Sequence, residues 1–414
     1  MKNEILNNKD NPEQLEQLYR QDSRAFKKAF DTLFDGNKEN QNFKCWNQRL
    51  NFKEEGLYLG GRKEILFIVM LVFAAGLFAN ISNLSIINSE EFFMRNTSFI
   101  ILPFISAYFL KKQTLNKKQI GITTGIFVIS AIYINLLPNI FKSSSIQLTY
   151  IHMPLFLWTV LGYSYLGNDL SDYGKRINFL KYIGDLIIMS AIVLLSCILF
   201  TVITFGLFQL IGFSIATFYM KHIAIWAIGG VPIFSTYLIN NNPNIINKVS
   251  PIIAKIFTPL VFMNLTVYLI TLIYAGKYPQ TDRTLLMIYN ALLVGVLALI
   301  FFSVAESDTS NKSNYKTILL LGLSILTIIV NAIALYAIVF RIFELGITPN
   351  RVAVLGGNIL IFIHLIIVGY NLLKVLRNKI GAEAIEKSIA TYLPVYAVWT
   401  GIVAFIFPII FGFK

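Results

Sequence analysis

Charge is scarce in this sequence. Only 14% of its 414 residues are charged and 56% are hydrophobic, with a mean hydropathy of +0.64. A soluble domain carries about 25% charged residues because its surface must be wetted. Apolar runs recur from residue 65 to the end, and about 20 apolar residues in a helix cross the hydrocarbon core of a bilayer. The sequence therefore predicts an all-α, polytopic membrane helical bundle.

Cysteine, histidine and catalytic motifs are scarce as well. The two cysteines, Cys45 and Cys197, build no disulfide framework, and a histidine-based metal centre would need nearly all of the 3 histidines. The sequence has no Gly-x-Ser-x-Gly, no His-Glu-x-x-His and no glycine-rich phosphate loop before a lysine. We therefore predict no catalytic residue, no metal and no cofactor, and the sequence disfavours an enzymatic function.

No acidic residue lies in the middle of an apolar run. Asp185, Glu306 and Glu344 come closest to the bilayer. Carriers driven by protons or sodium commonly place a carboxylate near the midplane, so this absence disfavours such a carrier. It leaves open a site built from backbone carbonyls at a broken helix.

Eleven spans are predicted, and the fifth is long enough to tilt strongly or to end in a re-entrant piece. They lie near residues 65–84, 92–110, 119–137, 145–166, 184–211, 221–239, 252–275, 284–305, 317–340, 352–373 and 391–413.

The net charge of +13 fits a membrane protein rather than a nucleic-acid binder, because loops rich in Lys and Arg stay in the cytoplasm. Most of the 35 lysines and arginines lie in the amino-terminal segment and in alternate loops after it. This distribution predicts a cytoplasmic amino terminus and, with an odd number of spans, an external carboxy terminus.

Residues 1–62 form a predicted cytosolic amphipathic helical head, followed by a transmembrane domain at 63–414. Asn11 and Pro12 are typical of a helix start, and apolar residues then recur at helical spacing as far as Phe34. A second short helix is predicted to hold Phe43, Trp46 and Leu50. Two amphipathic helices of this kind are too thin to bury their own apolar stripe. We therefore expect the head to rest on the bilayer, on the helical body or on a protein partner.

Polar residues inside the predicted spans are few. Four consecutive spans each carry one asparagine, and one of these spans also holds a histidine: Asn264, Asn290, Asn331, Asn358 and His364. These side chains either bond helices to one another or line a polar cavity. An intramembrane histidine is a functional candidate by default, so His364 is the strongest candidate for a functional residue among these five.

A glycine pair and a proline mark the sixth predicted span. Gly229, Gly230 and Pro232 weaken a helix, because glycine adds flexibility and proline removes a hydrogen-bond donor. The pattern is typical of a packing kink, and the alternative is a discontinuous helix that offers free carbonyls to an ion or solute.

The connector after the ninth span is dense in charge, glycine and proline. Arg341 and Glu344 are spaced to pair on one helix face, and Thr348 before Pro349 predicts a new helix start. Arg351 then falls in the first turn, where a cation opposes the helix dipole. We expect it to pair, for example with Glu344, or to bind an anion or a lipid headgroup.

Three stretches carry a family resemblance. Arg341-Ile-Phe-Glu-Leu-Gly-Ile-Thr-Pro-Asn-Arg351 with the following Val-Ala-Val-Leu-Gly-Gly-Asn, Asn11-Pro-Glu-Gln-Leu-Glu-Gln-Leu-Tyr19, and Val249-Ser-Pro-Ile-Ile-Ala-Lys-Ile-Phe-Thr-Pro259 resemble a bacterial family of multi-pass membrane proteins known as a domain of unknown function, the DUF-4153 domain. The resemblance implies a bacterial inner-membrane location. It implies no activity, substrate or catalytic residue.

Two functions follow as hypotheses. The first is a membrane-embedded binder or translocator of a small solute or lipid. The second is a non-transporting membrane scaffold or sensor whose head docks a partner protein. A continuous polar cavity at the asparagines and His364 would favour the first, and tight apolar packing there, with an exposed aromatic face on the head, would favour the second.

Overall fold

The computed structural model describes residues 1–50, 61–84, 88–113, 117–140, 143–210, 215–275, 283–306 and 314–414. Within these ranges the regular structure is helical throughout, without a strand, which confirms the predicted all-α class. By its internal contacts the chain divides into two units, Met1–Tyr58 and Leu59–Lys414.

The first unit holds four short helices. These are α1 (Lys2–Asn7), α2 (Pro12–Gln21), α3 (Ser23–Phe34) and α4 (Gln41–Leu50), with a 3₁₀ turn at Asp35–Asn37. Asn11 caps α2 by accepting a hydrogen bond from the Gln14 backbone N–H at 3.2 Å, and Pro12 opens the helix. The helix start is therefore placed as the sequence predicts.

This unit buries its own apolar stripe. The aromatic rings of Phe26, Phe30 and Phe43 are fully buried, and Ile5 of α1 closes the cluster together with Trp46 of α4. The expectation that the head is too thin to bury its stripe is wrong. It rested on one helix that ends near Phe34 and a short second helix at Phe43 and Trp46, whereas the first is divided into α2 and α3, and α1 adds Ile5 to the core.

The second unit contains the long helices. They are α5 (Arg62–Asn80), α6 (Ser89–Lys112), α7 (Lys117–Leu136), α8 (Ser144–Leu166), α9 (Tyr173–Leu210), α11 (Ile225–Asn241), α12 (Pro243–Ala275), α13 (Arg283–Ala305), α14 (Asn314–Leu345), α15 (Pro349–Leu376) and α16 (Glu383–Gly401). Short pieces join them: 3₁₀ turn Ile81–Asn83, α10 (Ala216–Tyr219), α17 (Phe407–Ile410) and π-helical turns at Met220–Ala224 and Ile402–Ile406.

Ten segments of the described chain are long and apolar enough to cross a membrane. The additional long helix α8, 23 residues in length, packs in the same bundle between α6, α7 and α16. This architecture is that of a multi-pass helical membrane protein.

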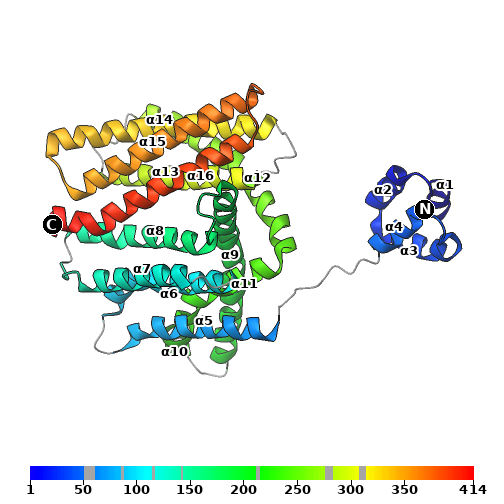
Figure 1. Cartoon of the computed structure of the whole chain (residues 1–414), viewed down its shortest axis with the longest axis horizontal. Coiled ribbons are helices and arrows are strands. Elements are labelled where there is room, and N and C mark those ends of the chain that lie inside the picture. The colour runs from blue at the N-terminus through cyan, green and yellow to red at the C-terminus, as the bar shows by residue number, and fades with distance from the viewer. Residues whose placement is uncertain are drawn as a thin grey trace. The chain divides into compact units, whose positions relative to one another are not determined.

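The bundle has two ends, which we name after residues that lie there. At the Arg62 end α5 begins, and α11 finishes beside it, with Asn241 Nδ2 3.4 Å from Glu64 Oε1. At the Lys414 end the last carbonyl of the chain accepts a hydrogen bond from the Ser145 N–H at the start of α8, at 2.9 Å. In Figure 1 the helices α5–α8 and α13–α16 run between these two ends.

Helix α9 runs across the others and stands upright in Figure 1. Its 38 residues measure about 57 Å at 1.5 Å per residue, far more than the roughly 30 Å hydrocarbon core, so it must tilt strongly. Its first turns form hydrogen bonds to α16 and α11. Arg176 donates to the Ala390 carbonyl of α16, and Tyr182 shares a 2.7 Å hydrogen bond with Thr236 of α11.

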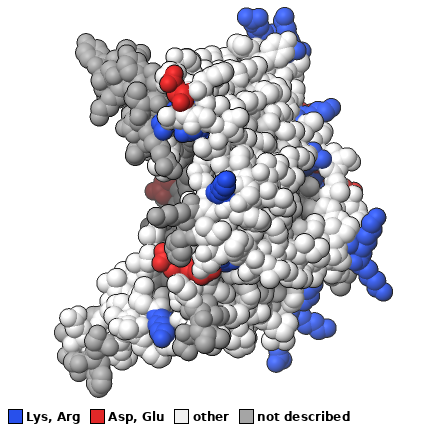
Figure 2. Space-filling view, turned by 90° about the vertical axis from the view of Figure 1, so that its left-hand side faces the viewer, with Lys and Arg blue, Asp and Glu red and all other residues white. Residues whose placement is uncertain are grey.

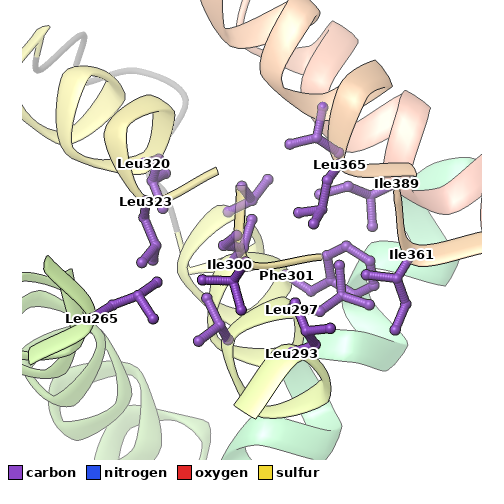
Figure 3. Close-up of a cluster of buried hydrophobic side chains, with 14 of the residues drawn as sticks. Leu265, Leu293, Leu297, Ile300, Phe301, Leu320, Leu323, Ile361, Leu365 and Ile389 are labelled. Carbon is purple, nitrogen blue, oxygen red and sulfur yellow. The ribbon is translucent and has the colours of Figure 1, made fainter. Parts of the chain in front are cut away.

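Two apolar cores flank α9. One is built from α12–α16, with Leu265, Leu293, Leu323, Leu365 and Ile389 converging as shown in Figure 3. The other joins α5, α6, α8 and α11. Helix α9 supplies Ile177 and Leu180 to the first core and Phe179 and Tyr182 to the second, so its opposite faces tie the two halves together.

Candidate functional site

A chain of amide groups joins α13, α14 and α15 in the first core. Asn358 donates from Nδ2 to Asn290 Oδ1 at 2.9 Å, and Asn331 donates from Nδ2 to the Asn358 backbone carbonyl at 3.1 Å. Asn331 is fully buried and Asn358 is buried as well. Three of the four asparagines singled out from the sequence therefore meet, and their contacts link helices directly.

His364 lies further along α15 towards the Arg62 end. The step of six residues from Asn358 rises about 9 Å. The imidazole is fully buried, its Nδ1 lies 3.1 Å from the Tyr396 hydroxyl, and its ring stacks on Tyr392 with centroids 4.3 Å apart. The Phe301 ring of α13 covers another side at 4.9 Å. Aromatic rings from two neighbouring helices thus fix the histidine in place.

We call this set the polar seam. It comprises six residues that contact one another, Asn290, Asn331, Asn358, His364, Tyr392 and Tyr396. It also includes Trp399, whose ring packs on Gly356, two residues before Asn358 on α15.

Three buried polar atoms of the polar seam have no hydrogen-bond partner among the described residues. They are Asn331 Oδ1, His364 Nε2 and the indole Nε1 of Trp399. The Trp399 ring packs so closely on α15 that a Cβ added to Gly356 would lie 2.1 Å from it. Buried polar groups in native proteins nearly always have a protein or water partner, so these three atoms are the candidates for hydrogen bonds to water or to a small molecule.

Asn264 is separate from the polar seam. It is exposed on α12, in a groove of about 390 Å³ between α12 and α13 that is otherwise lined by apolar side chains and Gly295. The predicted cavity of five polar residues is therefore divided. Four of them are packed inside the bundle and bonded to neighbours. The fifth is exposed on the outside, while the adjacent Leu265, turned about 100° around α12, is buried in the core.

The glycine pair of α11 serves packing. A Cβ added to Gly229 would lie 2.9 Å from the Ala75 Cβ of α5, and one added to Gly230 would lie 3.2 Å from Val72. The helix continues unbroken from Ile225 to Asn241 with Pro232 inside it. This geometry favours the packing interpretation over a discontinuous helix, and the described irregularity nearby is the π-helical turn before Ile225.

The connector between α14 and α15 lies at the Lys414 end. Gly346 ends α14 with a φ of +79°, and Thr348 caps α15 by accepting from the Arg351 N–H at 3.4 Å. The Arg351 guanidinium donates to the Leu345 carbonyl at 2.8 Å and to the Gly346 carbonyl at 2.5 Å. Arg351 thus pairs with carbonyls at the end of α14, where the helix dipole favours a cation.

The partner of Arg351 therefore differs from the one suggested by the sequence. The carboxylate of Glu344 is exposed and forms no ion pair within the described part of the chain. A pattern of charged side chains gives no information about backbone carbonyls, so the sequence did not predict that Arg351 bonds to them. Figure 2 looks onto this end of the bundle and shows a mostly uncharged face with isolated basic and acidic groups.

Sequence reasoning missed a buried arginine. Arg95 in α6 is only 5% exposed, and its guanidinium binds Glu91 at 2.8 Å and the carbonyls of Ile134 and Leu137 at 2.9 and 3.0 Å. The signal was present as an i, i+4 acid–base pair inside an apolar run. The carbonyl contacts at the end of α7 depend on tertiary packing.

A second charged group lies at the Arg62 end. The Ser250 hydroxyl donates to Asp185, and Lys181 Nζ lies 3.5 Å from the buried Glu306 carboxylate. Burial raises the pKa of Glu306, and the nearby Lys181 acts in the opposite direction. Within the described residues no group of three or more His, Cys, Asp or Glu side chains is arranged to hold a metal ion.

Comparison with known proteins identifies no relative. No family model, curated protein or solved structure matches this chain.

Proposed function

We propose that this protein is a membrane-embedded binder or translocator of a small solute, and that the polar seam is its site. The observation that carries the proposal is the set of unpaired buried atoms on Asn331, His364 and Trp399. An indole N–H can only donate, an amide oxygen can only accept, and a neutral imidazole nitrogen does either according to its tautomer.

The chemistry of these atoms defines the class of solute. A small neutral molecule that both donates and accepts hydrogen bonds would satisfy them, as water, urea or a short alcohol does. A charged solute is disfavoured, because no ionised side chain belongs to the polar seam to offset its desolvation. The rings of Tyr392 and Phe301 pack directly on His364, so the proposed solute is a small molecule.

Solute flux into proteoliposomes tests the proposal. Vesicles containing the protein are mixed rapidly with a solution of urea or a short alcohol, and stopped-flow light scattering follows the change in vesicle volume as solute and water enter. We expect faster swelling than in empty vesicles, and loss of that excess in His364→Phe and Asn331→Leu. The matched control is His152→Phe in α8, whose imidazole bonds the Leu148 carbonyl at 2.9 Å outside the polar seam. Equal rates with and without protein, together with no co-purified solute by native mass spectrometry, would refute the proposal.

The second candidate is a scaffold or sensor whose head docks a partner. The close bonding of Asn290, Asn331 and Asn358 between helices favours it, whereas the burial of the head's aromatic face in its own core does not. A unit that folds around its own core can still serve as a separate recognition module. Removing residues 1–58 separates the two functions. Under the transport proposal the solute flux persists, whereas under the scaffold proposal flux is absent from the full chain and only partner capture is lost.

The cellular setting is the bacterial inner membrane, with the amino terminus in the cytoplasm and the carboxy terminus outside. This proposal rests on the distribution of Lys and Arg and on the resemblance of the Arg341–Arg351 stretch to the DUF-4153 family. Reporter fusions to Lys414 test it. Alkaline phosphatase should be active there and green fluorescent protein dark, and the reverse pattern would overturn the orientation.

A further inference from the structure

The α12–α13 groove exposes a polar group on the outside of the bundle. Asn264 lies near the middle of the apolar part of α12 and is exposed, and the groove around it is formed by Phe257, Val261, Leu292 and Leu299 among others. Within the described chain no hydrogen bond to the Asn264 amide is formed. A side-chain amide in hydrocarbon is costly without a partner.

On this side of α13 the exposed residues are small, so the surface lies close to the helix backbone. Ala291, Gly295 and Ala298 follow one another at helical spacing and are all exposed, and a Cβ added to Gly295 would meet nothing within 4 Å. Small residues at such spacing let the backbone of another helix approach closely. The opposite side of α13 is occupied, since Asn290 bonds to the polar seam and Leu293 fills the core.

We propose that this face is the interface of a homodimer, in which the Asn264 amides of two copies pair across a two-fold axis. The amide is self-complementary, because each side chain offers both a donor and an acceptor. An isologous contact brings the same residue of each copy to the axis, so one residue satisfies both partners. A lipid acyl chain can fill the groove but has no hydrogen-bonding group at this depth, and it would leave the amide unpaired.

Crosslinking in native membranes tests the geometry. In a background with Cys45→Ser and Cys197→Ser, a cysteine is placed at Val261, one turn before Asn264 on the groove face. Oxidation should give a covalent dimer. A cysteine at Val202, which is 61% exposed on α9 and far along the chain from the groove, serves as the matched control and should stay monomeric. Equal crosslinking at both positions would overturn the proposal.

The dimerisation constant tests the role of the amide. Two interhelical hydrogen bonds of ordinary strength correspond to roughly a tenfold change in affinity, so Asn264→Leu should raise the dimer dissociation constant in nanodiscs about tenfold. Ser196→Leu, at an exposed hydroxyl on α9, should leave it unchanged. Gly295→Leu should abolish the dimer by blocking close approach.

Three results would contradict the homodimer. One is a chain that is monomeric at every concentration in nanodiscs, and another is a dimer that both groove variants leave unchanged. The third is a monomer that carries a small molecule lost in Asn264→Leu, detected by native mass spectrometry, which would make the groove a ligand site. Helix content by circular dichroism confirms that each variant is folded. None of these outcomes depends on solute flux through the polar seam.

Discussion

Replacing Arg95 should cost more stability than replacing most other charged residues of the bundle. Its guanidinium is only 5% exposed and binds Glu91 and the carbonyls of Ile134, Asn135 and Leu137. In Arg95→Met the Glu91 carboxylate loses its countercharge, and within the described residues it keeps the hydrogen bond that it accepts from Asn139 Nδ2 at 2.8 Å. Breaking a buried ion pair from one side costs about 3–5 kcal/mol, and we expect a loss in that range.

A double-mutant cycle separates the ion pair from the packing around it. When both partners become apolar, as in Arg95→Met with Glu91→Leu, no uncompensated charge remains, so the double variant should lose only about 1–2 kcal/mol. The coupling energy is the sum of the two single losses minus the double loss, so it should be at least about 2 kcal/mol. Lys63→Met, at an exposed position near the start of α5, is the control and should change the free energy of unfolding by about 0.5 kcal/mol or less.

Equilibrium unfolding in mixed micelles at increasing SDS fraction, followed by circular dichroism, measures these free energies. The reasoning fails if Arg95→Met costs less than about 1 kcal/mol, since this would mean that the guanidinium is in contact with water. It also fails if the two single losses simply add in the double variant. Either result would show that Arg95 does not hold α6 to the end of α7.

Three further predictions concern packing, capping and pH. Gly76→Leu should prevent α5 from docking on α11, because an added Cβ would lie 2.1 Å from the Trp226 ring. Gly121→Leu should be tolerated, because a Cβ there would meet nothing within 4 Å. The temperatures at which the two variants aggregate in detergent test this difference. Arg351→Ala should cost about 1 kcal/mol through the lost carbonyl contacts, and Glu344→Ala should be near neutral, as SDS titration will measure. Hydrogen bonds from two arginines lower the pKa of Glu16 from 4.5 to about 2, so its stabilisation of the head is present above pH 4.5 and lost as the pH falls towards 2. Urea unfolding of the head at several pH values should show this dependence, and Glu16→Gln should remove it.

The helical architecture follows from composition and spacing. Apolar runs about 20 residues long leave little choice but a spanning helix, and caps such as Asn11 and Thr348 can be identified because they depend on nearby residues alone. The bundle class and the places where α2 and α15 begin are therefore accessible from the sequence.

Tertiary contacts decide what the sequence leaves open. Asn264 and Asn331 have the same chemistry and similar positions within their helices, yet one is exposed on the groove and the other is fully buried. Only the orientation of each helix in the bundle distinguishes them. The same limit explains Arg351, whose partners are carbonyls, and the head, whose core is completed by Ile5 from a helix too short to show a pattern.

The polar seam holds a solute or water in this account, and X-ray hydroxyl-radical footprinting measures that most directly. Radicals formed from ordered water label side chains next to it, so Tyr396 and His364 should be modified at rates well above that of Tyr182, which is buried in the second apolar core. The His364→Phe variant should reduce labelling of Tyr396. Labelling of Tyr396 and His364 as slow as that of Tyr182 would show a dry seam and contradict the proposed function.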